Sequence, residues 1–253
     1  MKITVLSSGS KGNSTYVDLG SMKLLIDVGL SYNKIRERLS KINVDIKDID
    51  MVLISHDHTD HTYGLKVLLN KVKPMLYITK EVEKAVLQSK YENSIYIEDS
   101  INIKDVTIKI VPTSHDAITS NGFIVEQGKE SLVYITDTGY INHKYLKSIT
   151  NKTYYIFESN PDTEMLKKGP YPEYLKQRIL SDVGHLSNEL SAGYLSRIIG
   201  PDTKKVVLAH LSDTNNTPSI ALKTVNDILK ENEINFKIKD CASEEEILEV
   251  AKW

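Results

Sequence analysis

Apolar and polar residues follow two different patterns along this chain of 253 residues. The first part holds short apolar runs at 3–6, 14–19 and 23–27, and small turns with glycine separate them. Such runs predict a meander of antiparallel strands. The segment 31–42 instead places Ile35, Leu39 and Ile42 at helical spacing and its cationic residues on the other side, which predicts an amphipathic helix.

The remainder of the chain alternates between the same two patterns. Strands are predicted at 50–55, 75–78, 106–112, 122–126, 131–136, 154–158, 205–209 and 235–239. Helices are predicted at 61–72, 80–89, 173–180, 189–199 and 219–230, with a last one from Ser243. Two strand-rich halves, each followed by helices, predict an α/β fold of two sheets with helices outside, in four layers. Because no linker-like tract interrupts the pattern, we expect a single domain over 1–253.

Composition narrows the class of protein but not its substrate. An apolar content of 40%, a charged content of 26% and a net charge of −2 are those of an ordinary globular protein, and they neither favour nor exclude nucleic acid as a partner. The one cysteine, Cys241, excludes an internal disulfide and fits a reducing compartment. The first apolar run is too short for a signal peptide, and no run approaches the ~18 apolar residues of a membrane span. We therefore expect a cytoplasmic protein without membrane contact.

The most informative chemistry lies at 56–61, directly after the strand predicted at 50–55. This segment holds His56, His58, Asp60 and His61, and three of the seven histidines of the chain fall within it. Two histidines at i and i+2 of an extended segment lie on the same side, and imidazole and carboxylate suit zinc, manganese or iron. Asp60 and His61 fall on the following turn, where they can serve a second ion. The alternative is a solvated loop rich in histidine and aspartate.

Three more candidate ligands stand at the ends of predicted strands, where a rigid scaffold meets a loop. They are His115, Asp137 and His210, and Asp137 could bridge two ions through its two oxygens. Each alone could be a capping or solvated residue, but their order after the cluster favours a metal site. His143 falls at a predicted helix start and is expected at the surface, whereas His185 lies in a loop that contains Gly184.

With these residues the chain resembles the metallo-β-lactamase superfamily. The resemblance implies the αβ/βα sandwich, with His56, His58 and His115 on a first metal, Asp60, His61 and His210 on a second, and Asp137 on both. Asp27 matches a buried acidic position that would orient the ligand loop rather than bind metal. Zinc is favoured, with manganese or iron as alternatives.

A narrower resemblance, to the bacterial YycJ/WalJ-type subgroup, covers nearly the whole chain. It rests on the segments 6–14, 136–139, 158–160, 184–188 and 210–218. The subgroup is associated with 5′-to-3′ DNA exonuclease activity and is related to the tRNA 3′-processing ribonucleases, whose Gly-His-Ser-Thr segment resembles the one around His185. The resemblance therefore gives His185 a role at the scissile phosphate. Pro161 stands where the subgroup normally has histidine, so no role is carried to that position.

Together these features predict hydrolysis of phosphodiesters, because two divalent ions activate water and neutralise charge on phosphorus. Asp60 is the candidate proton acceptor and His185 the candidate proton donor. Three residues that closely follow His210 are expected to meet the phosphate: Ser212, Asn215 and Asn216. The turn at 7–14 is expected at another edge of the cleft.

Only residues 138–209 separate Asp137 from His210, which leaves no room for an inserted domain. Nucleic acid, with DNA favoured over RNA, would bind in an open groove or through a homo-oligomer.

Other hydrolases use the same ligands, so alternatives stay open. Thioester hydrolysis of the glyoxalase II type, or opening of another ester or a lactone, is the main one, although the Gly184–His185 segment argues against it. Secreted β-lactamases are disfavoured by Asp60 and by the missing signal peptide. A di-metal redox protein would need a flavin-binding partner domain, for which the chain holds no segment.

Overall fold

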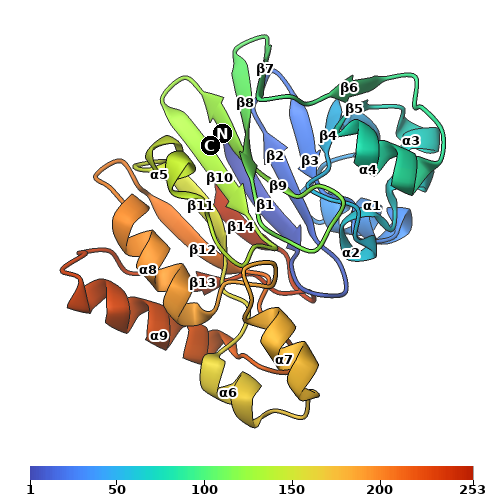
Figure 1. The fold of residues 1–253 in the computed structure, drawn as a ribbon. Coiled ribbons are helices and arrows are strands. Elements are labelled where there is room, and N and C mark those ends of the chain that lie inside the picture. The colour runs from blue at the N-terminus through green and yellow to red at the C-terminus, as the bar shows by residue number, and fades with distance from the viewer. Residues whose placement is uncertain (253) are drawn as a thin grey trace. The chain divides into compact units, whose positions relative to one another are not determined.

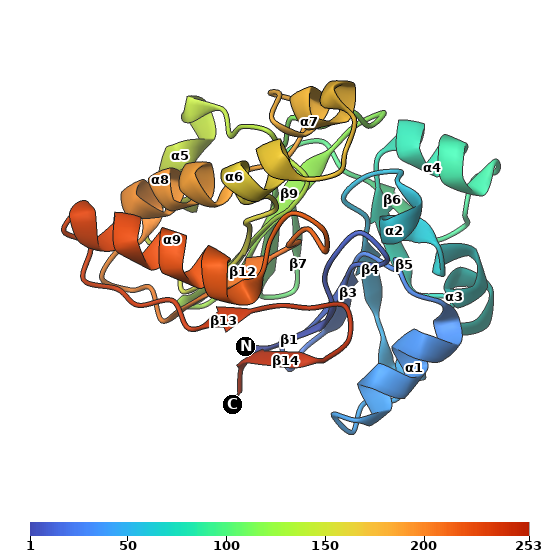
Figure 2. The ribbon, with the colours of Figure 1, turned by 90° about the horizontal axis from the view of Figure 1, so that it is seen from below.

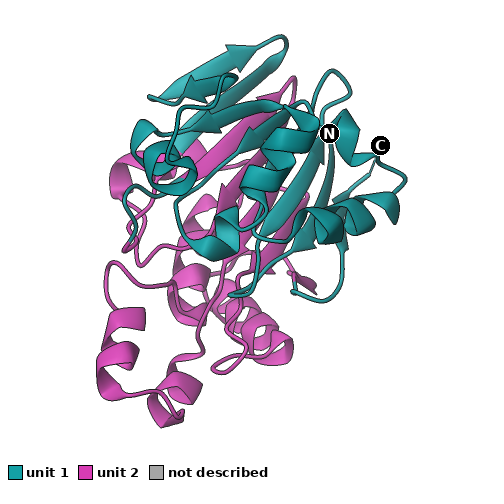
Figure 3. Ribbon diagram, turned by 90° about the vertical axis from the view of Figure 1, so that its right-hand side faces the viewer, with its two compact units in different colours: residues 1–110, 117–121, 243–253 teal, residues 111–116, 122–242 magenta. Residues whose placement is uncertain are grey.

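The computed structural model describes residues 1–252 and divides into two compact units, shown in Figure 3. Unit 1 comprises residues 1–110, 117–121 and the segment from Ser243 onward. Unit 2 comprises residues 111–116 and 122–242. The expectation of a single domain stays a prediction.

Unit 1 is built on a mixed sheet with the strand order β14-β1-β2-β3-β4-β5-β6 (Figure 1). Its strands are β1 (Lys2–Ser7), β2 (Ser14–Asp18), β3 (Lys23–Ile26), β4 (Met51–Leu53), β5 (Met75–Ile78), β6 (Ser94–Tyr96) and β14 (Leu248–Ala251). The first three strands pair antiparallel, as predicted, whereas β3, β4, β5 and β6 run parallel. The hairpin of β7 (Ser100–Ile103) and β8 (Val106–Pro112) follows them.

The three longer helices of unit 1 bury apolar side chains against this sheet. The helices of this unit are α1 (Tyr32–Ser40), the short η1 (Ile46–Asp48), α2 (Thr59–Thr62), α3 (Leu65–Val72) and α4 (Lys80–Leu87). Ile35 and Leu39 of α1 and Leu68 of α3 belong to one core with the strand residues Leu25 and Val52. Burial of such side chains contributes roughly 1.5–3 kcal/mol each, which makes this sheet a rigid support for the loops at its edge.

The helix predicted at 61–72 is two helices, and this part of the prediction is wrong. α2 ends at Thr62 and α3 begins at Leu65, with Gly64 between them. The Gly64 amide donates to the Val28 carbonyl over 2.9 Å, and a Cβ at Gly64 would lie 2.1 Å from the Leu30 carbonyl oxygen. This close backbone approach needs glycine and interrupts the helix.

Unit 2 also combines antiparallel pairing with a run of parallel strands. Its strands are β9 (Asn121–Gln127), β10 (Glu130–Ile135), β11 (Tyr154–Glu158), β12 (Lys205–Ala209) and β13 (Asp240–Cys241). β9 and β10 are antiparallel, whereas β10, β11, β12 and β13 are parallel. Its helices are α5 (His143–Ile149), α6 (Thr163–Lys168), α7 (Glu173–Ile179), α8 (Asn188–Ile198) and α9 (Pro218–Glu231). α8 and α9 lie side by side and pack on this sheet (Figure 2).

Two predictions near the C-terminus are wrong. The strand predicted at 235–239 is replaced by the short β13, and the helix predicted from Ser243 is replaced by β14, which pairs antiparallel with β1. The local sequence at 243–249 favours a helix, but the outer edge of β1 offers backbone groups that a strand satisfies. Tertiary pairing therefore outweighs local propensity here. Among the helices of residues 1–252, none has the length and apolar character that a bilayer crossing requires.

The parallel strands of both units place chemistry at their carboxyl ends. In unit 1, Asp27 follows β3 and His56 lies just beyond β4. In unit 2, Asp137 lies just beyond β10, Glu158 ends β11 and His210 follows β12. Ligand sites of open α/β sheets form at these ends. In each unit, the carboxyl ends of the parallel strands are therefore the expected place for a functional site.

Candidate metal centre

Three imidazoles gather at the edge of unit 1, as the sequence predicts for the segment 56–61. The ring centres of His56 and His58 are 4.7 Å apart, and those of His56 and His61 are 4.0 Å apart. His56 and His61 are fully buried, and His58 is half-buried. Rings this close together can direct several nitrogen ligands to one site, and neutral imidazole is the form that binds metal.

Asp27 fixes the ring nitrogens of two of these histidines. Its carboxylate accepts from the Ser55 amide (2.8 Å), from the Ser55 hydroxyl (2.9 Å) and from Nδ1 of His61 (2.8 Å). Because the Ser55 hydroxyl donates to Asp27, its oxygen accepts from Nδ1 of His56, which lies 2.9 Å away. Both rings thus carry their proton on Nδ1 and present the Nε2 lone pair, as a metal ligand requires. The predicted orienting role of Asp27 agrees with this geometry.

Asn13 ties the Asp60 side of the cluster to the turn at 7–14. Its amide nitrogen lies 3.3 Å from Oδ2 of Asp60 and 3.0 Å from Nε2 of His61. Its amide oxygen accepts from the Gly9 amide over 2.9 Å. Asp60 is 24% exposed, so its carboxylate is held in place and still reaches water.

A second cluster forms at the edge of unit 2. Asp137, Glu158, His185 and His210 each offer an atom within 4.8 Å of the others. Oδ1 of Asp137 lies 3.4 Å from Nε2 of His210, 3.8 Å from Nε2 of His115 and 3.9 Å from Nδ1 of His185. The unit therefore brings together all the site residues predicted within it at strand ends, and adds Glu158.

Glu158 is the counterpart of Asp27 in unit 2. It is fully buried, and its Oε1 lies 2.7 Å from Nδ1 of His185 and 3.2 Å from Nδ1 of His210. Its Oε2 accepts from the amides of Thr138 (2.9 Å) and Leu186 (3.2 Å). Burial alone would raise the pKa of this carboxyl, but the charge and hydrogen bonds of the histidines outweigh burial and lower the pKa. An ionised Glu158 only accepts hydrogen bonds, so it holds a proton on Nδ1 of His185. Nδ1 of His210 also lies 3.1 Å from the amide nitrogen of Asn160.

His115 is oriented by a backbone carbonyl instead. Its Nδ1 lies 3.1 Å from the Gly184 oxygen, which can only accept, so Nε2 carries the lone pair on the side of Asp137. Burial is the largest effect on this ring and lowers the pKa of His115, although Asp137 acts against it. A Cβ at Gly184 would lie 2.2 Å from the Ile179 carbonyl oxygen, so only glycine fits where this loop passes α7.

Three site residues have a left-handed backbone conformation. The φ angles are +61° at Asp27, +56° at Asp137 and +56° at His210. This conformation costs a non-glycine residue on the order of 1–2 kcal/mol, and such strain collects at functional sites. In each case the chain leaves a parallel strand and turns sharply, which directs the side chain along the sheet edge.

The predicted substrate residues after His210 are placed less favourably. Ser212 is half-buried, and its hydroxyl accepts from the Asn215 amide over 3.1 Å. Asn215 is 1% exposed and Asn216 is 4% exposed. The Asn216 side chain donates to the carbonyls of Ser159 and Asn160 and is paired with Asn188. Both side chains are thus buried, and the side chain of Asn216 bonds to other protein groups. Their expected contact with a phosphate stays a prediction.

The sequence-based prediction also missed several residues. Glu158 ends the apolar run of β11, which is the same signal that points to Asp137 and His210. Asn160 donates to the His210 carbonyl over 2.7 Å, and Pro161 accepts from the Asn188 amide over 3.0 Å. Ser55 carried no signal, because its role depends on a contact with Asp27 across two strands.

The donor set of each unit fits a divalent ion. Neutral imidazoles with fixed Nε2 lone pairs and carboxylates from aspartate are the ligands that zinc, manganese and iron share. Metal-binding histidines usually have the ring nitrogen that does not bind metal held by a carboxylate. Here Asp27 and Glu158 supply these carboxylates.

Comparison with known proteins assigns the family. The family model described as "Beta-lactamase superfamily domain" matches residues 23–211. The chain belongs to this metallo-β-lactamase superfamily. It is 38% identical over 251 residues to "Exodeoxyribonuclease WalJ" of Streptococcus pneumoniae, covering 94% of this chain and 93% of that one. It is 34% identical to "Exodeoxyribonuclease YycJ" of Bacillus anthracis, over 91% of this chain and 90% of that one.

The superfamily fold is confirmed by solved structures. The metallo-β-lactamase fold protein YhfI of Bacillus subtilis matches with a TM-score of 0.76 and 17% identity, over 98% of both chains. The predicted α/β class, with two mixed sheets and flanking helices, is therefore correct. Membership in this superfamily also implies a centre for divalent metal, in agreement with the histidine and aspartate clusters.

Proposed function

We propose that this chain is a metal-dependent DNA exonuclease that acts in the 5′-to-3′ direction. The observation that carries this proposal is the match, over nine-tenths of the chain, to two proteins named exodeoxyribonucleases. The metal-binding donor sets of both units agree with it. Single-stranded or end-accessible DNA, bound in an open groove, is the proposed substrate, and a cytoplasmic location is the expected one.

Two divalent ions are proposed to be held by seven side chains. These are His56, His58, Asp60, His61, His115, Asp137 and His210. When bound, such ions activate a water molecule and neutralise negative charge on the phosphate. Zinc remains the favoured metal, with manganese or iron as alternatives, because neutral imidazole and carboxylate serve all three.

The protein's own groups supply the proton transfers. The partly exposed Asp60 carboxylate is positioned by Asn13 and is proposed to accept the proton of the attacking water. His185 is 19% exposed, and its Nδ1 is bound to Glu158, so its Nε2 points to the opposite side of the ring. We propose that His185, protonated on both ring nitrogens, donates its Nε2 proton to the leaving oxygen or bonds through it to the phosphoryl oxygens. The segment after His210 is proposed to meet the phosphate through Ser212, Asn215 and Asn216.

Removal of a metal ligand tests the proposal. We expect His58→Ala and Asp60→Ala each to abolish metal-dependent degradation of a 5′-labelled DNA strand, because each removes a donor that no neighbouring side chain can replace. The matched control is His143→Ala, which removes an exposed imidazole at the start of α5 and should keep wild-type activity. Degradation that persists in both ligand variants at wild-type rates would contradict the assignment.

A separate variant tests His185. We expect His185→Ala to keep the wild-type metal content and to lose about 10²–10⁴-fold in turnover, which is the range of a positioned acid or base. Metal content measured by elemental analysis and turnover measured on the same sample separate the two roles. Unchanged turnover would remove His185 from the reaction, and loss of metal would make it a ligand instead.

A further inference from the structure

A cavity of about 490 Å³ lies in unit 1 directly beside the Asp60 end of the metal cluster. Three segments line it: the turn at 10–11, the segment 29–34 that leads into α1, and the segment 59–63 that contains α2. Its volume lies within the usual range for sites that hold one small organic ligand. Because Asp60 forms part of the wall, whatever occupies this cavity lies next to a proposed metal ligand.

Backbone hydrogen bonds join these three segments into one rigid wall. The Asn13 amide donates to the Asp60 carbonyl over 2.7 Å, and the Gly29 amide donates to the Asn13 carbonyl over 2.8 Å. The Val28 amide donates to the His61 carbonyl over 2.8 Å. A Cβ at Gly29 would lie 1.7 Å from the Asp60 carbonyl oxygen, so the ligand loop and this wall are in direct contact. The cavity therefore has a fixed position relative to Asp60.

The side chains of the wall are those that bind an anion and a flat ring. Lys11 and Lys34 supply positive charge, and Ser10 and Ser31 supply hydroxyls. Lys11 also pairs with Glu244 over 3.1 Å, so Lys34 is the cation less engaged within the protein. Tyr63 is 66% exposed, so most of its side chain is open to a ligand. Exposed aromatic rings next to cations form the platforms on which nucleic-acid bases stack.

We propose that this cavity holds the nucleotide adjoining the scissile phosphodiester, with Lys34 and Lys11 on its phosphate and Tyr63 stacked on its base. The inference rests on the proposed function and adds a subsite to it. Phosphate contacts position a strand without reading its sequence, and stacking on one ring accepts every base. The cavity therefore suits an exonuclease that degrades DNA of any sequence.

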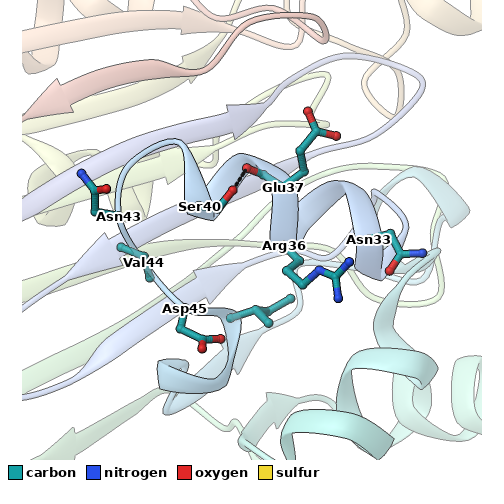
Figure 4. Close-up of a pocket in the computed structure, with 8 residues that line it drawn as sticks. Asn33, Arg36, Glu37, Ser40, Asn43, Val44 and Asp45 are labelled. Atoms are coloured by element: carbon teal, nitrogen blue, oxygen red, sulfur yellow. Dashed lines mark hydrogen bonds between the residues drawn. The ribbon is translucent and has the colours of Figure 1, made fainter.

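The same helix offers a matched control on its other side. Arg36 is two residues after Lys34, which rotates it about 200° around the helix axis. It lines a different cavity of about 770 Å³, together with Glu37, Asn43 and Asp45 (Figure 4). This second cavity lies between α1 and η1 and contains no residue of the metal cluster. Arg36→Gln removes one exposed charge from α1, as Lys34→Gln does, but away from the proposed subsite.

The test is the steady-state degradation of 5′-phosphorylated single-stranded DNA by four variants of the full chain with metal present. We expect Lys34→Gln to raise KM several-fold. The slope of log KM against log salt concentration should fall by about one, because one phosphate contact is lost. Tyr63→Ala should raise KM about 5- to 100-fold, whereas Tyr63→Phe should restore it, because phenylalanine keeps the stacking surface. kcat should stay near the wild-type value in all of them, and Arg36→Gln should change neither constant.

Three results would overturn the subsite while leaving the exonuclease in place. The first is a Lys34→Gln variant that behaves like Arg36→Gln, and the second is equal KM for Tyr63→Ala and Tyr63→Phe. The third is a fall in kcat with unchanged KM, because a subsite outside the reacting atoms acts on binding. Failure of the proposed function looks different, since the wild-type protein itself would then leave the DNA intact.

Discussion

Asp27→Asn is expected to lower metal affinity about 10- to 100-fold and to suppress DNA degradation, while the protein stays folded. The Asp27 carboxylate accepts three hydrogen bonds, from the Ser55 amide, the Ser55 hydroxyl and Nδ1 of His61. An asparagine brings an NH₂ group into this network. If its oxygen keeps the Ser55 amide, its nitrogen faces His61, which must then accept through Nδ1 and carry its proton on Nε2. A protonated Nε2 cannot bind metal.

The effect should extend to a second histidine. With the new side-chain amide as donor, the Ser55 hydroxyl turns to donate toward Nδ1 of His56, so that this ring also changes its tautomer. The backbone should not change, because asparagine accepts the left-handed conformation at φ +61° as readily as aspartate. Metal titration by calorimetry measures the loss, and the ¹⁵N shifts of the imidazoles report the tautomer.

The control for this variant is Asp50→Asn. Asp50 stands at the opposite end of the same parallel strands, where its carboxylate accepts from the Lys23 amide over 2.8 Å. It undergoes the same chemical change and should keep wild-type metal affinity. Equal metal affinity in Asp27→Asn and Asp50→Asn would show that the carboxylate is merely structural.

Glu158→Gln is the corresponding change in unit 2 and is expected to lower turnover about 10²–10⁴-fold. Its carbonyl oxygen should stay with the amides of Thr138 and Leu186, because both must donate. The new NH₂ group then faces Nδ1 of His185 and of His210. Nδ1 of His185 must then accept, and the neutral glutamine no longer stabilises the doubly protonated ring from which Nε2 would donate. His210 loses its carboxylate partner in the same variant.

Circular dichroism, turnover and metal content together distinguish this explanation from simple unfolding. Circular dichroism should show a folded protein, because a buried charge is replaced by a neutral group of the same shape. Glu126→Gln is the control, since Glu126 pairs with Lys152 at 2.7 Å and lies opposite Ser131 near the start of β10, at the far end of that strand from Asp137. Its turnover should match the wild type. A Glu158→Gln variant with wild-type turnover and metal content would refute the orienting role.

The site residues that could be predicted are those whose position follows from the neighbouring residues along the chain. The alternation of strands and helices gave the class of fold, and the apolar runs before His56, Asp137 and His210 placed these residues at strand ends. Neither inference needs knowledge of which strands are neighbours. The carboxyl ends of parallel strands lie together in any such sheet.

What the sequence could not reveal depends on contacts between distant segments. Ser55 matters only because β3 and β4 are neighbours, and Glu158 matters because β11 lies between β10 and β12. The helix predicted from Ser243 failed for the same reason, since β14 is stabilised by β1 from the other end of the chain. The bonds of Asn216 to residues 159, 160 and 188 inside unit 2 likewise join segments that are distant in the sequence.

The central claim is that the chain hydrolyses phosphodiesters of DNA from the 5′ end with bound divalent metal. The most direct measurement offers the chelator-treated and metal-reloaded protein a single-stranded DNA with a label at either end, alongside RNA of the same sequence and S-lactoylglutathione. The account predicts immediate release of labelled mononucleotide from the 5′-labelled DNA, later release from the 3′-labelled strand, and an intact thioester. Rapid thioester hydrolysis with both DNA strands intact would contradict it.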